Sequence, residues 1–101
     1  MAIGSNNLLA THTGTGSTLA IGYSALASLT TGAENVAIGY NSMQNNTVGD
    51  RNIALGAFTL RSNTTGSDNT ALGHRALSAN TTGDANTGLG DSTLRENTIG
   101  Y

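Results

Sequence analysis

Glycine recurs in this chain at a fixed interval of 17 residues, and this period constrains the fold more than any other feature. Two glycine series share the period, and the second follows the first by ten residues. The first series is Gly22, Gly39, Gly56, Gly73 and Gly90, and the second is Gly32, Gly49, Gly66, Gly83 and Gly100. A fixed period of this length is typical of proteins in which one structural unit stacks on the next. We therefore expect a repeat architecture.

Written from Ala20, the unit reads A-[IL]-G-x-x-[AST]-[LM]-x-x-[NL]-T-[TVI]-G-x-x-N-[TVI]. One extra residue precedes Gly22, and we interpret it as a bulge in a surface turn. The unit occurs about six times, over residues 2–19, 20–36, 37–53, 54–70, 71–87 and 88–101. The end units carry no distinct capping sequence, which solenoids usually need. We expect one repeat domain, residues 1–101, that is a segment of a longer fibre.

Short β-strands broken by glycine turns fit this unit better than helices do. Gly, Thr and Asn are unfavourable in helix interiors, and the stretches between glycines are too short for stable helices. Equivalent strands of successive units would pair in parallel, each with the unit above and below. The sequence predicts an all-β fold, a parallel β-solenoid (β-roll or β-helix) of 17-residue coils. We expect both glycine series at turns, where glycine permits a positive φ.

Alternation within the predicted strands separates two faces. In Val36-Ala37-Ile38 and Ile53-Ala54-Leu55, large apolar residues stand two apart, and Ala points to the opposite face. We expect the large residues to enter the core, together with a column of Leu and Met, and the Ala column to contact another subunit. The expected core is Leu26, Met43, Leu60, Leu77, Leu94, Ile21, Ile38, Leu55, Leu72 and Leu89, and the expected subunit interface is Ala20, Ala37, Ala54 and Ala71.

Two columns of asparagine follow the same period. Asn tolerates the left-handed backbone region, and stacked amides can hydrogen-bond in a ladder, so we expect both columns at corners of the coil. One column is Asn35, Asn52, Asn69 and Asn86, and the other is Asn46, Asn63, Asn80 and Asn97.

Composition favours the association of several chains. The sequence contains one Phe and no Trp, and charged residues make up only 10%. Each unit therefore brings few large apolar side chains, and a lone coil with so thin a core would be marginally stable. Burial against copies of the same chain would supply the missing contacts. This argument predicts an oligomer without distinguishing three chains from two.

The same composition argues against several functional classes. The net charge is −2 and there is no basic run, so the chain lacks the electrostatic signature of nucleic-acid binding. No apolar stretch approaches the roughly 20 residues of a membrane-spanning helix. Cysteine is absent, which excludes disulfides and thiolate metal sites. We expect no nucleic-acid partner, no membrane insertion and no cofactor.

No arrangement of residues indicates catalysis, because nothing places a base beside a nucleophile. We therefore expect no enzyme activity. His12 and His74 occupy different positions in the repeat, so stacking would not bring them together as metal ligands. Acidic residues after the second glycine, with Arg51 among them, indicate weak ion pairs between coils and not a calcium site. These residues are Glu34, Asp50, Asp68 and Asp84.

Tyr23 and Tyr40 share one column of the repeat. An exposed Tyr can contact a glycan or protein ligand, but the aromatic character is lost along the column, which favours a structural role. The column continues with Ala57, His74 and Asp91. Three N-x-[ST] sequences, which begin at Asn45, Asn63 and Asn80, are interpreted as Asn–Thr corners and not as glycan acceptors.

Three stretches resemble known repeats: Asn35-Val36-Ala37-Ile38-Gly39-Tyr40, Asn69-Thr70-Ala71-Leu72-Gly73-His74 and Asn80-Thr81-Thr82-Gly83. They are similar to the head repeats of trimeric autotransporter adhesins and, more closely, to the NTAIGY and NTTG repeats of phage tail-fibre-like proteins. The resemblance covers essentially the whole chain. It implies a left-handed β-roll or related β-helix, a homotrimer, and an extracellular location on a virion tail or a bacterial cell surface. It implies no catalytic residues in the repeats.

Three functions are compatible with these patterns. The leading hypothesis is a stiff shaft or head segment of a trimeric fibre for attachment, with a host receptor or glycan as an external partner. The alternative is an ice-binding β-solenoid, although adjacent pairs such as Thr64-Thr65 point to opposite faces and do not form a Thr-x-Thr row. A self-assembling filament is the third, because exposed strand edges can stack end to end.

Overall fold

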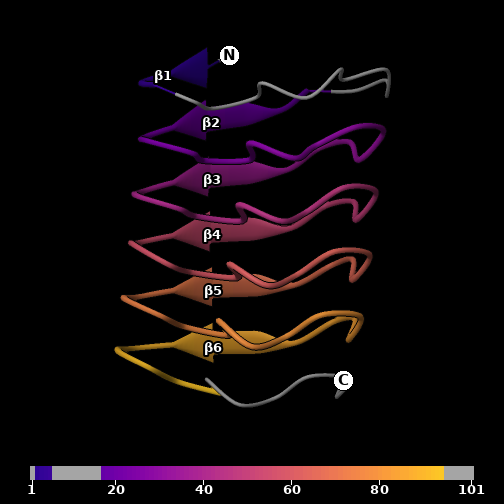
Figure 1. Cartoon of the computed structure of the whole chain (residues 1–101). Coiled ribbons are helices and arrows are strands. Elements are labelled where there is room, and N and C mark those ends of the chain that lie inside the picture. Colours follow the sequence, from indigo (N-terminus) through magenta and orange to yellow (C-terminus); the bar gives the residue numbers. More distant parts are fainter. Residues whose placement is uncertain (1, 6–16, 95–101) are drawn as a thin grey trace.

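The computed structural model describes residues 2–5 and 17–94, which form a β-solenoid (Figure 1). One sheet of six parallel strands runs through them in the order β1 to β6, with one strand from each coil. The described residues contain no helix. The all-β, parallel solenoid predicted from the sequence is confirmed. The strands are β1 (Ala2–Ile3), β2 (Leu19–Ile21), β3 (Val36–Ile38), β4 (Ile53–Leu55), β5 (Thr70–Leu72) and β6 (Thr87–Leu89).

Neighbouring strands pair so that equivalent residues of the repeat lie side by side. Ala37 pairs with Ala20 on one side and with Ala54 on the other. Ala2 pairs with Ala20, so the first coil accommodates its extra residue without losing register. Hydrogen bonds continue beyond the strands, as where the Gly39 N–H donates to the Ile21 carbonyl at 2.8 Å. Each coil is therefore bonded to the next around most of its circumference.

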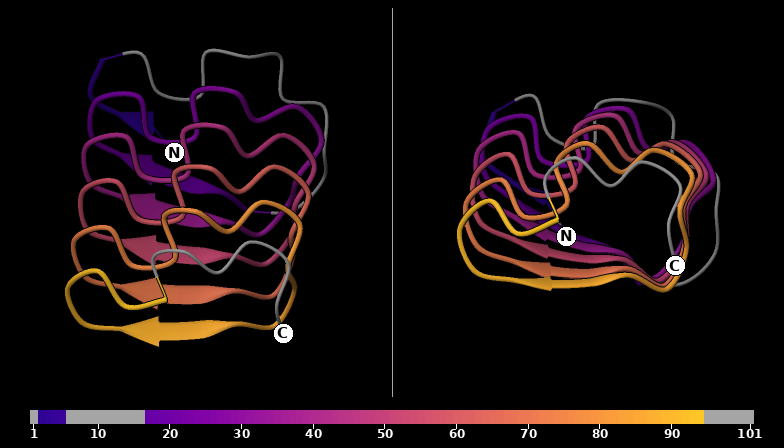
Figure 2. Two further views of the ribbon diagram at one scale, coloured as in Figure 1. Left: turned by 60° about the horizontal axis from the view of Figure 1, so that its bottom comes forward. Right: turned by 90° about the horizontal axis from the view of Figure 1, so that it is seen from below.

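Viewed along the axis, each coil is a flattened loop (Figure 2). The sheet forms one wall, a tight corner follows each strand, and an undulating segment returns along the opposite wall. The sheet and the returning segment thus enclose a narrow interior that repeats from coil to coil.

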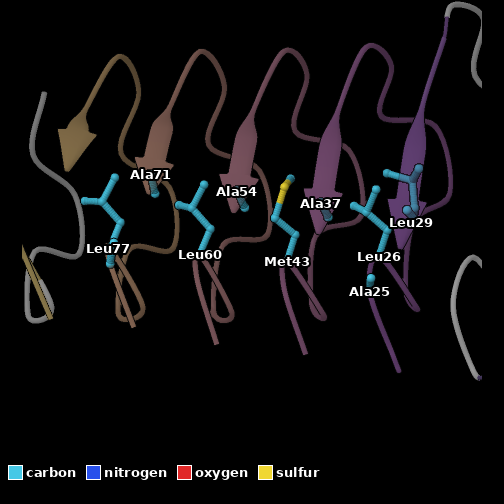
Figure 3. Close-up of a cluster of buried hydrophobic side chains, with 11 residues drawn as sticks. Ala25, Leu26, Leu29, Ala37, Met43, Ala54, Leu60, Ala71 and Leu77 are labelled. Atoms are coloured by element: carbon cyan, nitrogen blue, oxygen red, sulfur yellow. The ribbon is translucent and has the colours of Figure 1, made fainter. Parts of the chain in front are cut away.

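A row of Leu and Met side chains runs along this interior. Leu26, Met43, Leu60 and Leu77 are fully buried and lie in line across from Ala37, Ala54 and Ala71 (Figure 3). These four residues belong to the core column predicted from the sequence, and their burial is confirmed. Leu94, in the last coil described, is 48% exposed.

The predicted orientation of the strands is wrong. Ala20, Ala37, Ala54 and Ala71 point into the coil and are 0% exposed in the single chain, so they are not available as a subunit interface. The large residues beside them point outward. The side chain from the opposite wall extends to the sheet, so the inner strand position has room only for a methyl group. The residues wrongly assigned to the core are Ile21, Ile38, Leu55 and Leu72, which are half-buried, and Leu89, which is exposed.

Both asparagine columns form buried ladders, as expected. In one, the Asn52 amide donates to Asn35 Oδ1 at 3.2 Å and the Asn69 amide donates to Asn52 Oδ1 at 3.0 Å. In the other, Asn63 donates to Asn46 Oδ1 at 2.9 Å. The side chains point into the coil, and these residues do not have the positive φ expected of them. A buried polar group is tolerated when its hydrogen bonds are made, and each rung satisfies the next.

The two ladders meet at the carbonyl groups of the second glycine series. Gly49 O accepts from Asn35 Nδ2 at 2.8 Å and from Asn46 Nδ2 at 3.1 Å. Gly66 O likewise accepts from Asn52 at 2.8 Å and Asn63 at 2.9 Å. These carbonyls therefore link the two polar columns within and between coils.

The two glycine series serve different purposes, which corrects the prediction that both allow positive φ. Gly22 and Gly39 have φ values of 123° and 134°, and Gly56, Gly73 and Gly90 share this left-handed region. The second series, Gly32, Gly49, Gly66 and Gly83, does not. A Cβ at Gly66 would collide with the Gly83 carbonyl oxygen and the Asn63 amide, so close approach requires glycine there. Gly100 and His12 lie outside the described residues.

Several residues other than glycine also adopt positive φ. The buried column is among them, with φ of 53° at Leu26, 49° at Met43 and 51° at Leu60. Two further positions in each coil do the same, one of which holds Glu34, Arg51, Asp68 and Ala85. This region costs an L-residue other than glycine about 1–2 kcal/mol. Stacking must therefore offset a recurring backbone strain.

We expect Asn63→Ala to destabilise the fold by about 1–3 kcal/mol, because it leaves buried amide and carbonyl groups of neighbouring rungs without partners. Asn45→Ala, at an exposed position in the preceding coil, should stay within about 0.5 kcal/mol of the wild type. Chemical denaturation of both variants measures the difference. Equal effects would show that the ladder does not stabilise the stack.

We expect Ala85→Gly to stabilise the fold by about 0.5–1 kcal/mol. Its φ of 58° is strained for Ala, and the relief exceeds the entropic cost of glycine, about 0.5–1 kcal/mol. Ala79→Gly, where φ is not positive, should destabilise by about 0.4–1 kcal/mol. The melting temperatures of the two variants should move in opposite directions, and a parallel loss would contradict the strain.

Candidate functional site

The outward side of the sheet is a continuous apolar surface, called here the outer sheet face. Two columns of strand side chains form it, one on each side of the inward-pointing Ala. One column holds Ile or Leu throughout, and the other changes from Leu, Val and Ile to Thr. Ile53 is 39% exposed and Leu89 is 61% exposed. The face comprises Ile3, Leu19, Ile21, Val36, Ile38, Ile53, Leu55, Thr70, Leu72, Thr87 and Leu89. Large exposed apolar patches mark interaction surfaces.

A row of aromatic rings follows the corner that comes after each strand. Tyr23 and Tyr40 stack with ring centroids 5.4 Å apart at 14°, and both side chains are nearly half exposed. Phe58 continues the row edge-on, 5.4 Å from Tyr40 and 5.9 Å from His74. The column predicted from the sequence has Ala57 at this point. Phe58, one residue later, fills the gap, and the sequence analysis missed it because it leaves the column.

Two arginines lie over the Phe58 ring. The guanidinium carbons of Arg61 and Arg75 are each 5.5 Å from its centroid. A hollow of about 220 Å³ is lined by Phe58, Arg61, Arg75 and Ser78. Within residues 2–5 and 17–94, neither arginine has a carboxylate partner. The repeat pattern did not predict this site, because its residues come from two different columns and from two adjacent coils.

One ion pair links adjacent coils, as the sequence predicted. Arg51 donates to Asp68 through Nε at 2.6 Å and through a terminal nitrogen at 3.0 Å. These hydrogen bonds raise the pKa of Arg51 and lower the pKa of Asp68 from their ordinary values. Asp50 and Asp84 instead accept backbone N–H groups of the preceding coil, from Ala33 and Ser67, at 2.8 Å each. The loop after the second glycine is thus stabilised by hydrogen bonds between adjacent coils.

Other candidate chemistry is not assembled in the part of the chain that the structure describes. No group of three or more His, Asp or Glu side chains lies close enough there to hold a metal ion. His74 has Asp91 beside it at 3.4 Å. No helix in that part is long and apolar enough to cross a membrane.

The threonine columns do not form a two-row lattice. The Thr64 hydroxyl donates to the Thr81 carbonyl at 3.3 Å, so the first Thr of each pair is used within the stack. The second Thr is exposed, as at Thr65 and Thr82, but Val48 interrupts that row. No observation therefore favours the ice-binding alternative.

Comparison with protein-family models, with curated proteins and with solved structures returned no match to this chain. The fold alone defines the class of protein, and this class is the β-solenoid repeat proteins. Its two distinctive surfaces are the outer sheet face and the aromatic corner.

We expect Asp68→Asn to lower the melting temperature at neutral pH, with the difference from the wild type disappearing in acid. The pKa of Asp68 is lowered in the folded state, so its contribution is complete above the unfolded value of about 3.9 and is lost as pH falls through the lower folded pKa. Thermal melts across this range measure the effect. In an Arg51→Gln background the substitution should have little effect, and a pH-independent difference would contradict the ion pair.

Proposed function

We propose that this chain is a structural segment of an extracellular fibre, of the kind found in phage tail fibres and bacterial surface adhesins, in which copies associate through their outer sheet faces. The observation that carries the proposal is the apolar outer sheet face itself. It places two large apolar side chains, such as Val36 and Ile38, at the surface of a single chain in β2, β3 and β4, and one in β1, β5 and β6.

The interior of the coil is too small to stabilise a long stack on its own. In each central coil it holds one Leu or Met, one Ala, a small residue and two Asn, as in Ala54, Thr59, Leu60, Asn63 and Asn69. Full burial of a large apolar side chain contributes about 1.5–3 kcal/mol relative to full exposure. Association through the outer sheet face would add this burial in coil after coil, so the gain increases with the length of the fibre.

Two further aspects of the proposal come from the family resemblance. These are the number of chains, three, and the left-handed sense of the coil. The extracellular setting has the same source. The physical argument supports association through a defined face, and it applies to any small symmetric assembly.

The function that fits this architecture is that of a stiff spacer. Hydrogen bonds join every coil to its neighbours, and the buried ladders fix the register, so bending would break several interactions together. Such a segment holds a recognition element at a distance from the particle or cell that carries it. We propose no reaction for it.

We expect the wild type to have the light-scattering mass of a discrete oligomer and Ile53→Asp to have the mass of a monomer. Ile53 is already 39% exposed, so a charge there is tolerated in the single chain but is costly in an apolar interface. The matched control is Thr65→Asp, on an exposed loop of the same coil, which should keep the oligomer. Circular dichroism should show that both variants remain folded. A monomeric wild type, or dissociation caused equally by Thr65→Asp, would contradict the proposed interface.

A further inference from the structure

We infer that the corner formed by Tyr40, Phe58, Arg61, Arg75 and Ser78 binds an acidic sugar residue. We call this group the aromatic–arginine corner. The inference goes beyond the structural function proposed above, and it does not depend on which face mediates association.

The charge distribution points to an anionic ligand. The chain has a net charge of −2, yet two of its few cations converge on one ring, each with its guanidinium carbon 5.5 Å from the Phe58 centroid. Among the described residues, Asp68 is paired with Arg51, and Asp91 lies 3.4 Å from His74. Two like charges that line one hollow disfavour each other, and an anion bound there would relieve the repulsion. A guanidinium fork also matches the geometry of a carboxylate.

The aromatic side chains supply the second half of the site. Phe58 lines the hollow and supplies an aromatic ring surface there, and the Tyr40 ring, which is 49% exposed, lies 5.4 Å from Phe58. The C–H face of a sugar ring packs on such a surface, while its hydroxyl groups need polar partners. Ser78 and the two guanidinium groups provide these partners. The corner therefore combines an apolar platform with anion-binding donors.

The size of the hollow limits the ligand to about one ring. Its volume of about 220 Å³ is below the roughly 300–1,000 Å³ typical of pockets for drug-sized molecules. A single acidic sugar unit within a longer glycan fits this description, because the neighbouring units can extend along the surface. The stacked Tyr23 and Tyr40 rings lie on one side of the site, in the coils before it.

The arrangement does not suit a nucleic acid. Single-stranded nucleic acids need a positive groove that tracks successive phosphates. The column of Arg75 holds Ser24, Asn41, Phe58 and Ser92 at its other described positions, and the column of Arg61 holds Ala27, Gln44 and Ser78. Among the described residues of these two columns, positive charge is thus confined to Arg61 and Arg75. A local cation pair fits one carboxylate better than a phosphate chain.

The test measures binding of trigalacturonate, a trisaccharide of carboxylated sugars, by isothermal titration calorimetry at low and physiological salt. The matched neutral probe is the corresponding trisaccharide of galactose. We expect the acidic probe to bind and the neutral probe to bind at least about tenfold more weakly, because charged hydrogen bonds to the arginines are lost. Arg61→Gln and Arg75→Gln should each weaken binding of trigalacturonate by about tenfold or more.

Arg51→Gln is the control, because it removes the same charge from an exposed site away from the corner, and it should leave binding unchanged. Phe58→Leu should weaken binding of the acidic probe, and circular dichroism should show that this variant stays folded. Failure of the wild type to bind trigalacturonate, equal binding of both sugars, or equal loss in Arg51→Gln would each overturn the inference. Tighter binding of an oligothymidylate would also overturn it, in favour of a nucleic-acid ligand. Light scattering on the same samples shows whether the assembly is intact, so this result can be separated from that of the fibre proposal.

Discussion

The buried carbonyl groups of the second glycine series hold the coils in register, and the rest of the structure depends on them. Gly49 O and Gly66 O each accept two hydrogen bonds, one from a side-chain amide of each asparagine ladder. A slip of one residue would leave these amides and carbonyls buried without partners, at about 1–3 kcal/mol for each group. Because the penalty recurs in every coil, the 17-residue period is enforced by polar groups and not by the apolar core alone.

The sequence was sufficient to predict the period, the parallel strands, the Leu and Met column and the amide ladders. All of these features follow from residues that recur every 17 positions. It did not show which face of each strand points inward, because alternation separates two faces without orienting them. That choice depends on the opposite wall, where Leu60 takes up the available width and leaves space only for Ala54. The positive φ at Leu60 was missed for a related reason, since tertiary packing, and not local preference, selects it. The aromatic–arginine corner was missed because its residues come from different columns of adjacent coils.

The inward orientation of the Ala residues places polar side chains in the interior and large apolar side chains on the surface. Asparagine amides lie in the interior, where they hydrogen-bond to one another and to backbone carbonyls, while Ile and Leu lie on the outer sheet face. A solvated sheet face usually carries polar residues, and the exposed Ile53 and Leu89 are a departure from that pattern. The polar interior sets the register and contributes little hydrophobic stabilisation. The apolar outer sheet face does not set the register, but it can bury large side chains against another chain. The interior and the outer sheet face together therefore fit a chain that needs both precise stacking and lateral partners.

The residues that depart from the repeat carry the remaining information about function. The central coils share their glycines, their amides and their small inward residue, so those positions follow the period. Phe58 and Arg75 share one column that holds Ser or Asn at its other described positions, and the column of Arg61 holds small or polar residues at its other described positions. The stacking therefore does not require these three residues. They nevertheless line one hollow, and because Phe58 and Arg75 come after the ends of β4 and β5, they do not belong to the outer sheet face. Lateral association through the sheet would therefore leave this corner accessible. A fibre built in this way can repeat one structural surface along its length and still present a single local binding site.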